Sequence, residues 1–163
     1  WVPVDLVADR PLHPGFAASW PRLRALLPVR PALVVDAANV VGSVPDGWWR
    51  DRAGAAARLR DALAALAERG VDATVLDLPE NVWFPEIVLI VEGDARAVGD
   101  DATRAVRIVR AAGAGDDAIV DVAEGLRAEG RAVTAVTSDR ELTGRLERSG
   151  ASVRSVSWLR DLL

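Results

Sequence analysis

The sequence ALVVDAANVVG, residues 32–42, begins with an apolar run that ends at an aspartate. The run from Ala32 to Asp36 is too short and too continuous to be an exposed strand, so it predicts a strand buried on both faces. Residues 86–92 (EIVLIVE) and 105–110 (AVRIVR) are predicted as further strands of this kind. Strands buried on both faces are typical of a parallel sheet that helices cover on each side.

Segments with helical periodicity separate these strands. Residues 50–69 place Leu59, Leu63 and Leu66 on one helical face, and Gly70 follows as the expected end of the helix. The alternation predicts an α/β fold, a three-layer sandwich with a mostly parallel central sheet of about five strands flanked by helices. Two more strands are predicted at 132–137 and 152–155. Three more helices are predicted: one at 116–129, one that is capped by Ser138 or Asp139 and ends at residue 148, and one around Trp158.

The first 31 residues differ from the rest in composition. Prolines at positions 3, 11, 14, 21, 28 and 31 interrupt regular structure, which indicates an extended arm with one short helix near residues 21–27. We therefore expect an arm at 1–31 and one α/β domain at 32–163, a length that can bury a single sizeable core.

Missing residue types narrow the chemistry. The chain has no cysteine, which excludes thiol nucleophiles, disulfides and thiolate metal sites within it. All 20 basic residues are arginine, so a P-loop lysine and Schiff-base chemistry are excluded. The single histidine, His13, lies in the arm, which argues against a Ser-His-Asp triad or a histidine-rich metal site. An enzyme made from this chain would depend on carboxylates, hydroxyls, arginine and metal.

The charge and hydropathy of the chain bear on its partners. A formal net charge of −4 argues against a strongly cationic nucleic-acid surface but leaves open a nuclease whose substrate contacts are local. No apolar run approaches the roughly 18 to 20 residues of a membrane span, and no secretory signal is visible. We expect no membrane partner and a cytoplasmic location.

Aspartates follow three of the predicted strands. Asp36 ends the first, the pair Asp116-Asp117 follows the third, and Asp139 follows the fourth. Helix capping alone explains a single aspartate at a strand end. Several in one crevice, at the carboxyl edge of a parallel sheet, would repel one another unless a cation lay between them. The sequence therefore predicts a Mg²⁺ or Mn²⁺ site, for which carboxylates are suitable hard ligands.

Three strings carry a resemblance to a known family: VVDAANVVG at 34–42, GDDAIV at 115–120 and VTSDREL at 136–142. In this order they resemble NYN domains of the PIN-like superfamily, especially the bacterial YacP-like branch. The YacP-like pattern usually has Gly-Tyr between the first aspartate and the asparagine, where this chain has Ala37-Ala38.

The resemblance implies a catalytic set and a reaction. It implies a ribonuclease that hydrolyses RNA phosphodiester bonds with metal, in which Asp36 is the first acidic ligand and Asn39 orients it. It also implies that Asp116 or Asp117 is the second acid and that Asp139 is the third. RNA is accordingly the expected partner, and Mg²⁺ or Mn²⁺ the expected cofactor.

Further residues near the predicted crevice are candidates for substrate contacts. Each arginine among them could neutralise phosphate or lie on a solvated helix face. The pair Trp48-Trp49 could stack on bases or pack in the core, and Glu92 could add a carboxylate. The candidate substrate-binding residues are Ser43, Arg50, Arg52, Ser138 and Arg140.

The start of the chain carries a second resemblance. Residues 1–6 (WVPVDL) and 11–16 (PLHPGF) resemble the tail that closes many Nudix hydrolase domains, which implies a Nudix domain N-terminal to this chain. Two alternatives to a ribonuclease therefore remain open. One is a non-catalytic RNA-binding or protein-interaction module of PIN-like fold, and the other is the partner region of a Nudix-type nucleotide pyrophosphohydrolase.

Overall fold

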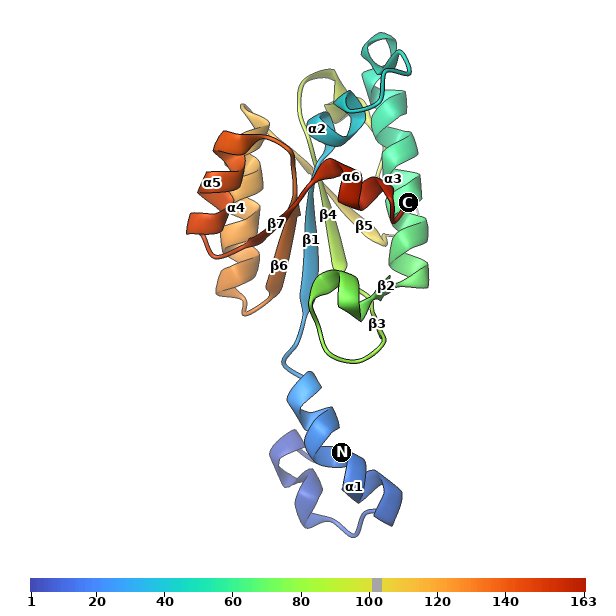
Figure 1. The fold of residues 1–163 in the computed structure, drawn as a ribbon, viewed down its shortest axis with the longest axis vertical. Coiled ribbons are helices and arrows are strands. Elements are labelled where there is room, and N and C mark those ends of the chain that lie inside the picture. The colour runs from blue at the N-terminus through green and yellow to red at the C-terminus, as the bar shows by residue number, and fades with distance from the viewer. Residues whose placement is uncertain (101–103) are drawn as a thin grey trace.

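The computed structural model describes residues 1–100 and 104–163. Within these ranges a five-stranded parallel sheet forms the centre of the molecule, with the strand order β5-β4-β1-β6-β7 (Figure 1). The central strand β1 is buried along its whole length, as its continuous apolar run predicts. The strands are β1 (Pro31–Asp36), β4 (Glu86–Val91), β5 (Val106–Arg110), β6 (Ala132–Val136) and β7 (Ser152–Arg154).

Helices cover both faces of the sheet (Figure 1). Leu33 and Val35 of β1 belong to one apolar cluster together with Leu63 of the helix on that face. Val34 belongs to a second cluster with Ile119, because successive side chains of a strand point to opposite faces. The predicted three-layer α/β sandwich is thereby confirmed. One face is covered by α3 (Arg52–Arg69) and α6 (Val156–Arg160), and the other by α4 (Gly115–Ala128) and α5 (Arg140–Arg148).

The long helix α3 begins and ends where local chemistry satisfies its free backbone groups. The Asp51 carboxylate caps its start by accepting a hydrogen bond of 2.8 Å from the Gly54 N–H. Gly70 ends the helix with a φ of +78°, a conformation that residues with a Cβ rarely adopt. The three leucines predicted for its inner face are all buried.

The arm contains more helix than its prolines suggested. Helix α1 spans Pro14–Leu26, in place of the short helix expected near residues 21–27, and a 3-10 helix precedes it at Val4–Asp9. α1 begins early because proline is favoured in the first helical turn. In addition, the His13 ring accepts a hydrogen bond of 3.2 Å from the Gly15 N–H.

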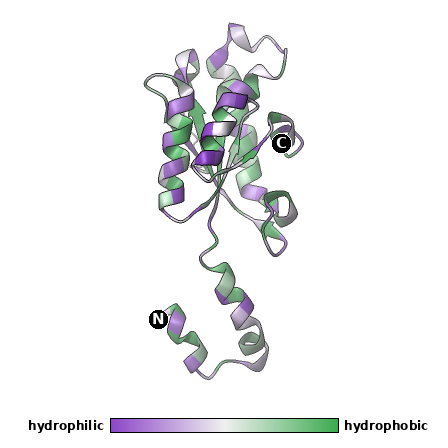
Figure 2. Ribbon diagram, turned by 60° about the vertical axis from the view of Figure 1, so that its left-hand side comes forward, coloured by the Kyte–Doolittle hydropathy of each residue, from purple (hydrophilic) through white to green (hydrophobic). Residues whose placement is uncertain are grey.

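The arm lies outside the core. Residues 1–30 are all described, and none of them is buried. The arm projects from the edge of the sheet opposite to α2 (Ala37–Gly42) (Figure 1). Hydrophobic and hydrophilic residues are interspersed along it, whereas the strands are mainly hydrophobic (Figure 2).

Several short elements were not predicted. Among them are α2 and an antiparallel hairpin of β2 (Val71–Asp72) and β3 (Val82–Trp83). Three 3-10 helices, Trp48–Arg50, Ala73–Leu76 and Gly93–Ala97, also lie within the described part of the domain. No helix among the described residues is long and apolar enough to cross a membrane.

Candidate functional site

The sheet reverses its strand order between β1 and β6. From β1 the chain continues outward through β4 to β5 on one side, and it then crosses to β6 and β7 on the other. In open α/β sheets such a reversal leaves a crevice at the carboxyl ends of the strands. The connections that follow β1, β4, β5 and β6 therefore supply the residues of the candidate site.

Asp36 ends β1 in this crevice, with 7% of its surface exposed. Its Oδ1 accepts a hydrogen bond of 3.0 Å from the Asn39 N–H, which caps α2, and its Oδ2 accepts one of 3.0 Å from the Thr137 hydroxyl. Burial raises the pKa of Asp36 above its ordinary value, and the charges of Asp116 and Glu92 raise it further. The two hydrogen bonds oppose that shift, because they favour the ionised form.

A second link joins α2 to the loop after β6. The Asn39 side-chain oxygen accepts a hydrogen bond of 2.9 Å from the Ser138 N–H. The Thr137 oxygen also accepts one of 3.2 Å from the Asp139 N–H. The Ser138 hydroxyl is used elsewhere, because it accepts a hydrogen bond of 3.1 Å from the Val156 N–H. Asn39 and Thr137 thus fix the position of one loop against the other.

Asp139 caps α5 and also lines the crevice. Its Oδ1 accepts a hydrogen bond of 2.8 Å from the Leu142 N–H. The residue is exposed, and it borders the same cavity as Asp36. Capping and ligand binding are compatible here, because the cap uses one carboxylate oxygen and leaves the other available.

Glu92 follows β4 directly and reaches the start of α4. Its Oε2 accepts a hydrogen bond of 2.7 Å from the Gly115 N–H. A Cβ at position 115 would lie 2.8 Å from that same oxygen, so glycine at this position lets the carboxylate approach the helix. The sequence analysis names Glu92 as a possible additional carboxylate, and Glu92 borders the cavity.

Carboxylates from four connections border one cavity of about 280 Å³. Burial raises the pKa of Asp116, the charges of Asp139 and Glu92 raise it further, and Arg145 opposes them. The first turns of α4 and α5 also meet this cavity, and the partial positive charge of a helix N-terminus offsets part of the repulsion. Within the described residues, the acidic side chains of this cavity are Asp36, Glu92, Asp116 and Asp139.

The neighbouring aspartates Asp116 and Asp117 have different surroundings. Asp116 borders the cavity, whereas Asp117 does not. The Asp117 carboxylate instead accepts a hydrogen bond of 2.6 Å from the Arg145 guanidinium, in a largely exposed ion pair. The structure thus brings Asp36, Asn39, Asp116 and Asp139 together and leaves Asp117 beside the group.

The candidate substrate residues are more scattered. Arg52 borders a second cavity next to the acidic one. The Ser43 hydroxyl donates a hydrogen bond of 2.7 Å to the Val40 carbonyl at the end of α2. Arg50 and Arg140 are exposed, and neither borders the two cavities.

The donor set suits a hard divalent cation, because it consists of carboxylate oxygens and one amide. Over residues 1–100 and 104–163, however, no three Asp, Glu or His side chains are already close enough to hold one ion together. Asp116 and Asp139 are exposed. An ion that draws the carboxylates together would therefore require rotation of side chains at the surface and no change in the core.

Thr137 is the site residue that the sequence analysis missed. It is buried, with 2% of its surface exposed, and it bonds both Asp36 and Asp139. A threonine between an apolar strand and a helix cap is a weak signal, because strands are rich in threonine for reasons of packing. Its role becomes visible only once β1 and β6 are known to be neighbours.

The chain shares the fold of the solved structures of Rae1 (YacP), and an acidic crevice lies at the carboxyl edge of its sheet. One crystal structure of Rae1 (YacP) from Bacillus subtilis has a TM-score of 0.59 and 17% identity, over 80% of this chain and 72% of that chain. A point mutant of the same protein has a TM-score of 0.56 and 17% identity, over 82% of this chain and 75% of that chain. At this level of identity the likeness establishes the fold.

Sequence comparison gives a different and much shorter match. No family model matches the chain. A stretch of 24 residues is 75% identical to "Putative 8-oxo-dGTP diphosphatase 3" in two strains of Mycobacterium tuberculosis. The stretch covers 15% of this chain and 11% of that protein, so the chain matches only a small part of its relatives.

Proposed function

We propose that the chain is a metal-dependent ribonuclease whose aspartates hold Mg²⁺ or Mn²⁺ in the crevice. The observation that supports this most directly is the gathering of Asp36, Glu92, Asp116 and Asp139 around one cavity. Two of these carboxylates, Asp36 and Asp116, have raised pKa values to which their acidic neighbours contribute. A cation between them would replace this repulsion with attraction.

The capping explanation accounts for only part of this arrangement. Asp36 and Asp139 do cap helices, and aspartate is a favoured cap. Asp116, however, lies inside the first turn of α4, where it caps nothing, and Glu92 comes from a different connection. Four independent connections that each direct a carboxylate to one cavity favour a ligand site.

Each residue of the proposed site would have its own role. A bound ion would supply activation of water and stabilisation of the leaving oxygen. Asp36 would stay fixed, because both of its oxygens are hydrogen-bonded. Asp116 and Asp139 would adjust, because both are exposed. Arg140, an exposed residue directly after Asp139, would offset the charge of an RNA phosphate near the crevice.

RNA is proposed as the substrate on two grounds. The strings around Asp36, Asp116 and Asp139 resemble those of YacP-like NYN domains, for which ribonuclease activity is expected. The fold is shared with Rae1 (YacP) over 80% of this chain. The net charge of −4 is a property of the whole chain, whereas phosphate contacts depend on the residues beside the crevice, so the net charge does not exclude an RNA substrate.

The test exploits the two neighbouring aspartates. Cleavage of a labelled mixed-sequence RNA is measured with Mn²⁺ and with excess EDTA, for the wild type, Asp116→Asn and Asp117→Asn. We expect cleavage with Mn²⁺ and none in EDTA. Asp116→Asn should lose at least about tenfold in rate, the lower end of the cost of disturbing a metal site. Asp117→Asn should retain most of the rate, because its carboxylate faces Arg145.

Two outcomes would contradict the proposal. Absence of cleavage with both Mn²⁺ and Mg²⁺ would favour the non-catalytic RNA-binding or protein-interaction module. Cleavage that persists in EDTA, or that is unaffected by Asp116→Asn, would remove the aspartate-held ion from the explanation.

A second candidate function is supported by the short sequence match. The stretch that is 75% identical to an 8-oxo-dGTP diphosphatase, and the Nudix-like strings in residues 1–16, favour a partner region of a nucleotide pyrophosphohydrolase. This candidate predicts that fusing the chain to a Nudix hydrolase domain changes the rate of 8-oxo-dGTP hydrolysis. An unchanged rate would remove this candidate.

A further inference from the structure

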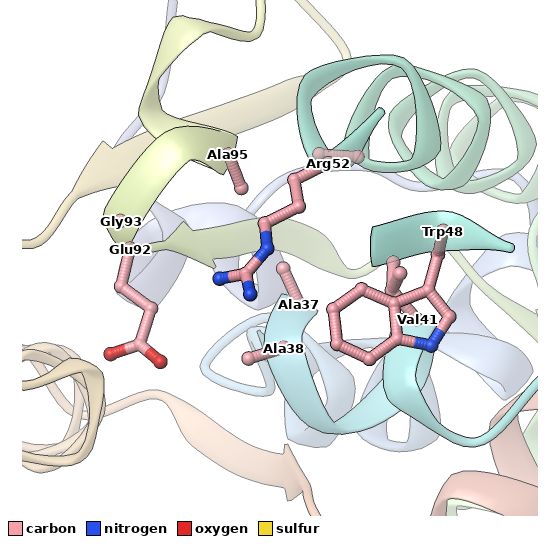
Figure 3. A pocket seen from close by; sticks show the side chains of 9 residues that line it. Ala37, Ala38, Val41, Trp48, Arg52, Glu92, Gly93 and Ala95 are labelled. Atoms are coloured by element: carbon pink, nitrogen blue, oxygen red, sulfur yellow. The ribbon is translucent and has the colours of Figure 1, made fainter. Parts of the chain in front are cut away.

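A second cavity, of about 320 Å³, lies beside the acidic crevice, and Figure 3 shows the side chains that line this second cavity. Ala38 and Glu92 border both cavities, so the two are neighbours. Its volume lies at the lower end of the range of about 300–1,000 Å³ that is usual for small-molecule sites. A ligand of this size could occupy it while a neighbouring group of the same molecule lies in the crevice.

Trp48 and Arg52 form one side of this cavity. The Arg52 guanidinium carbon lies 5.4 Å from the centroid of the Trp48 ring, in a cation–π contact. The guanidinium points into the cavity between Trp48 and Glu92 (Figure 3). Among the described residues, none accepts a hydrogen bond from Arg52 or pairs with it in a salt bridge, so its donors are available to a ligand.

Small side chains form the remaining walls. Ala37, Ala56 and Ala95 border the cavity from α2, α3 and the segment after β4. Their short side chains leave an apolar slot beside the Trp48 ring and the Arg52 guanidinium. Aromatic rings and guanidinium planes are the surfaces on which proteins stack single-stranded bases.

The charge of the residues that line the cavity favours a base over a phosphate as the bound group. Glu92 borders the cavity, and its carboxylate would repel an anion placed there. A nucleobase is uncharged, has two flat apolar faces, and carries hydrogen-bond acceptors that the Arg52 donors can meet. The lining therefore favours the base of a nucleotide, with its phosphate outside the slot.

We propose that this cavity binds one unpaired nucleobase of an RNA strand, next to the nucleotide whose phosphate enters the acidic crevice. The assignment rests on the proposed ribonuclease function. It gives that function a substrate class, single-stranded RNA, because a base paired within a duplex cannot enter the slot.

The test measures binding without cleavage. Fluorescence anisotropy of a short labelled single-stranded RNA is followed in excess EDTA, with the same strand lacking bases at successive positions as comparison. Trp48→Ala should weaken binding of the intact strand by roughly 5- to 150-fold, the range that stacking of one base supplies. It should leave binding of the strand without bases unchanged. Arg52→Gln should act in the same direction.

A matched control comes from the same segment. Arg58→Ala removes another arginine of α3, one that does not border the cavity. This variant should bind RNA like the wild type. Trp48→Phe should recover much of the affinity, because phenylalanine also offers a flat ring. If Trp48 had only a structural role, the melting temperatures of Trp48→Ala and Trp48→Phe would fall equally.

The outcomes separate this proposal from the ribonuclease proposal. If Trp48→Ala and Arg52→Gln bind the intact RNA as the wild type does, or if the wild type binds both strands equally, the base site is wrong, whether or not Mn²⁺-dependent cleavage is found. If RNA is not cleaved but Trp48-dependent binding persists, the base site stands and the catalytic proposal fails.

Discussion

The Thr137 hydroxyl donates a hydrogen bond of 3.0 Å to Asp36, although the two residues are 101 positions apart in the chain. The bond exists because β1 and β6 are parallel neighbours in which Val35 pairs with Val136, so the residues that follow them lie side by side. Asp36 is the only buried charged residue among residues 1–100 and 104–163, and the bond gives it a partner, since a buried carboxylate without one would be costly.

Replacing Thr137 with valine tests this bond. Thr137→Val keeps the side-chain shape but leaves Asp36 Oδ2 without its donor, so stability should fall by about 1–3 kcal/mol. Metal affinity should fall by about 10- to 100-fold, the usual cost of removing a partner that orients a ligand. Thr134→Val, in β6 three residues before Thr137 and outside the acidic cavity, is the control. Equal effects on Mn²⁺ affinity in titrations of both variants would rule out the orienting role.

The acidic cavity should make the protein sensitive to divalent metal. Asp116→Asn removes one repelling charge without removing a cap, so the metal-free protein should melt at the same temperature or higher. Mn²⁺ should raise the melting temperature of the wild type, by the equivalent of about 2.7 kcal/mol at a hundredfold excess over the dissociation constant. The gain should shrink in Asp116→Asn. Calorimetry of both proteins, with and without Mn²⁺, measures this, and an identical gain would contradict it.

Asp139→Asn distinguishes capping from metal binding. Asparagine caps helices nearly as well as aspartate, so the metal-free stability should stay within about 0.5 kcal/mol. The Mn²⁺-induced rise in melting temperature should nevertheless shrink, because a charged ligand is lost. A variant that keeps the full rise would identify Asp139 as a cap alone.

The raised pKa values predict a pH dependence. A carboxyl whose pKa is raised by folding contributes stability that is complete below the unfolded pKa, here near 3.8, and is lost as the pH rises through the folded value. The stability advantage of metal-free Asp116→Asn over the wild type should therefore be small below pH 3.8 and larger at neutral pH. Urea denaturation at both pH values measures the difference, and an advantage that is greatest in acid would show that the sign is wrong.

Gly115→Ala tests the position of the Glu92 carboxylate. A Cβ at this position would meet Glu92 Oε2 at 2.8 Å and push the carboxylate out of place. The Gly115 N–H would then lose its hydrogen bond to Glu92, so stability should fall by about 1 kcal/mol. The rate of Mn²⁺-dependent RNA cleavage should fall, and Gly125→Ala, in the same helix with open space around it, should leave it unchanged. Full activity of Gly115→Ala would argue against a role for Glu92.

The arm should be dispensable for the site. Residues 1–28 project from the opposite edge of the sheet, and their ion pair from Arg22 to Glu80 is largely exposed. Such a pair is worth about 0–1 kcal/mol. Trp20 and Leu23 of the arm also lie across a cavity from Val82 and Trp83, far from the acidic cavity. Deleting 1–28 should therefore lower the melting temperature but leave a cooperative unfolding transition, which calorimetry measures. RNA cleavage should persist, and its loss in a folded truncation would place part of the site in the arm.

The fold could be predicted because long apolar runs and periodic helices carry strong local signals. The run through Asp36 and the leucine face of residues 50–69 each specify an element without reference to the rest of the chain. Helix α2, by contrast, has six residues, which is too short for periodicity to appear. Helix α1 is longer than the sequence predicts, because Pro14 starts this helix, whereas proline inside a helix usually breaks it.

The candidate site could be predicted in part. Strand ends located the aspartates, but they could not distinguish Asp116 from Asp117, since that depends on which side of α4 faces Arg145. The role of Thr137 depends on the pairing of β1 with β6, and the cavity beside Trp48 depends on how a loop folds over α3. Such features are set by tertiary contacts, and no single segment of the sequence encodes them.

The bonds between α2 and the loop after β6 also bear on synthesis of the chain. Asn39 and Ser138 are 99 positions apart. A ribosome that adds about 5–20 residues per second therefore makes Asn39 several seconds before Ser138. A nascent chain that has emerged only through α4 carries Asp36 and Glu92 without Thr137 or Asp139. The crevice cannot be assembled until β6 has been released and has paired with β1, so any activity of this site begins only with late folding of the domain.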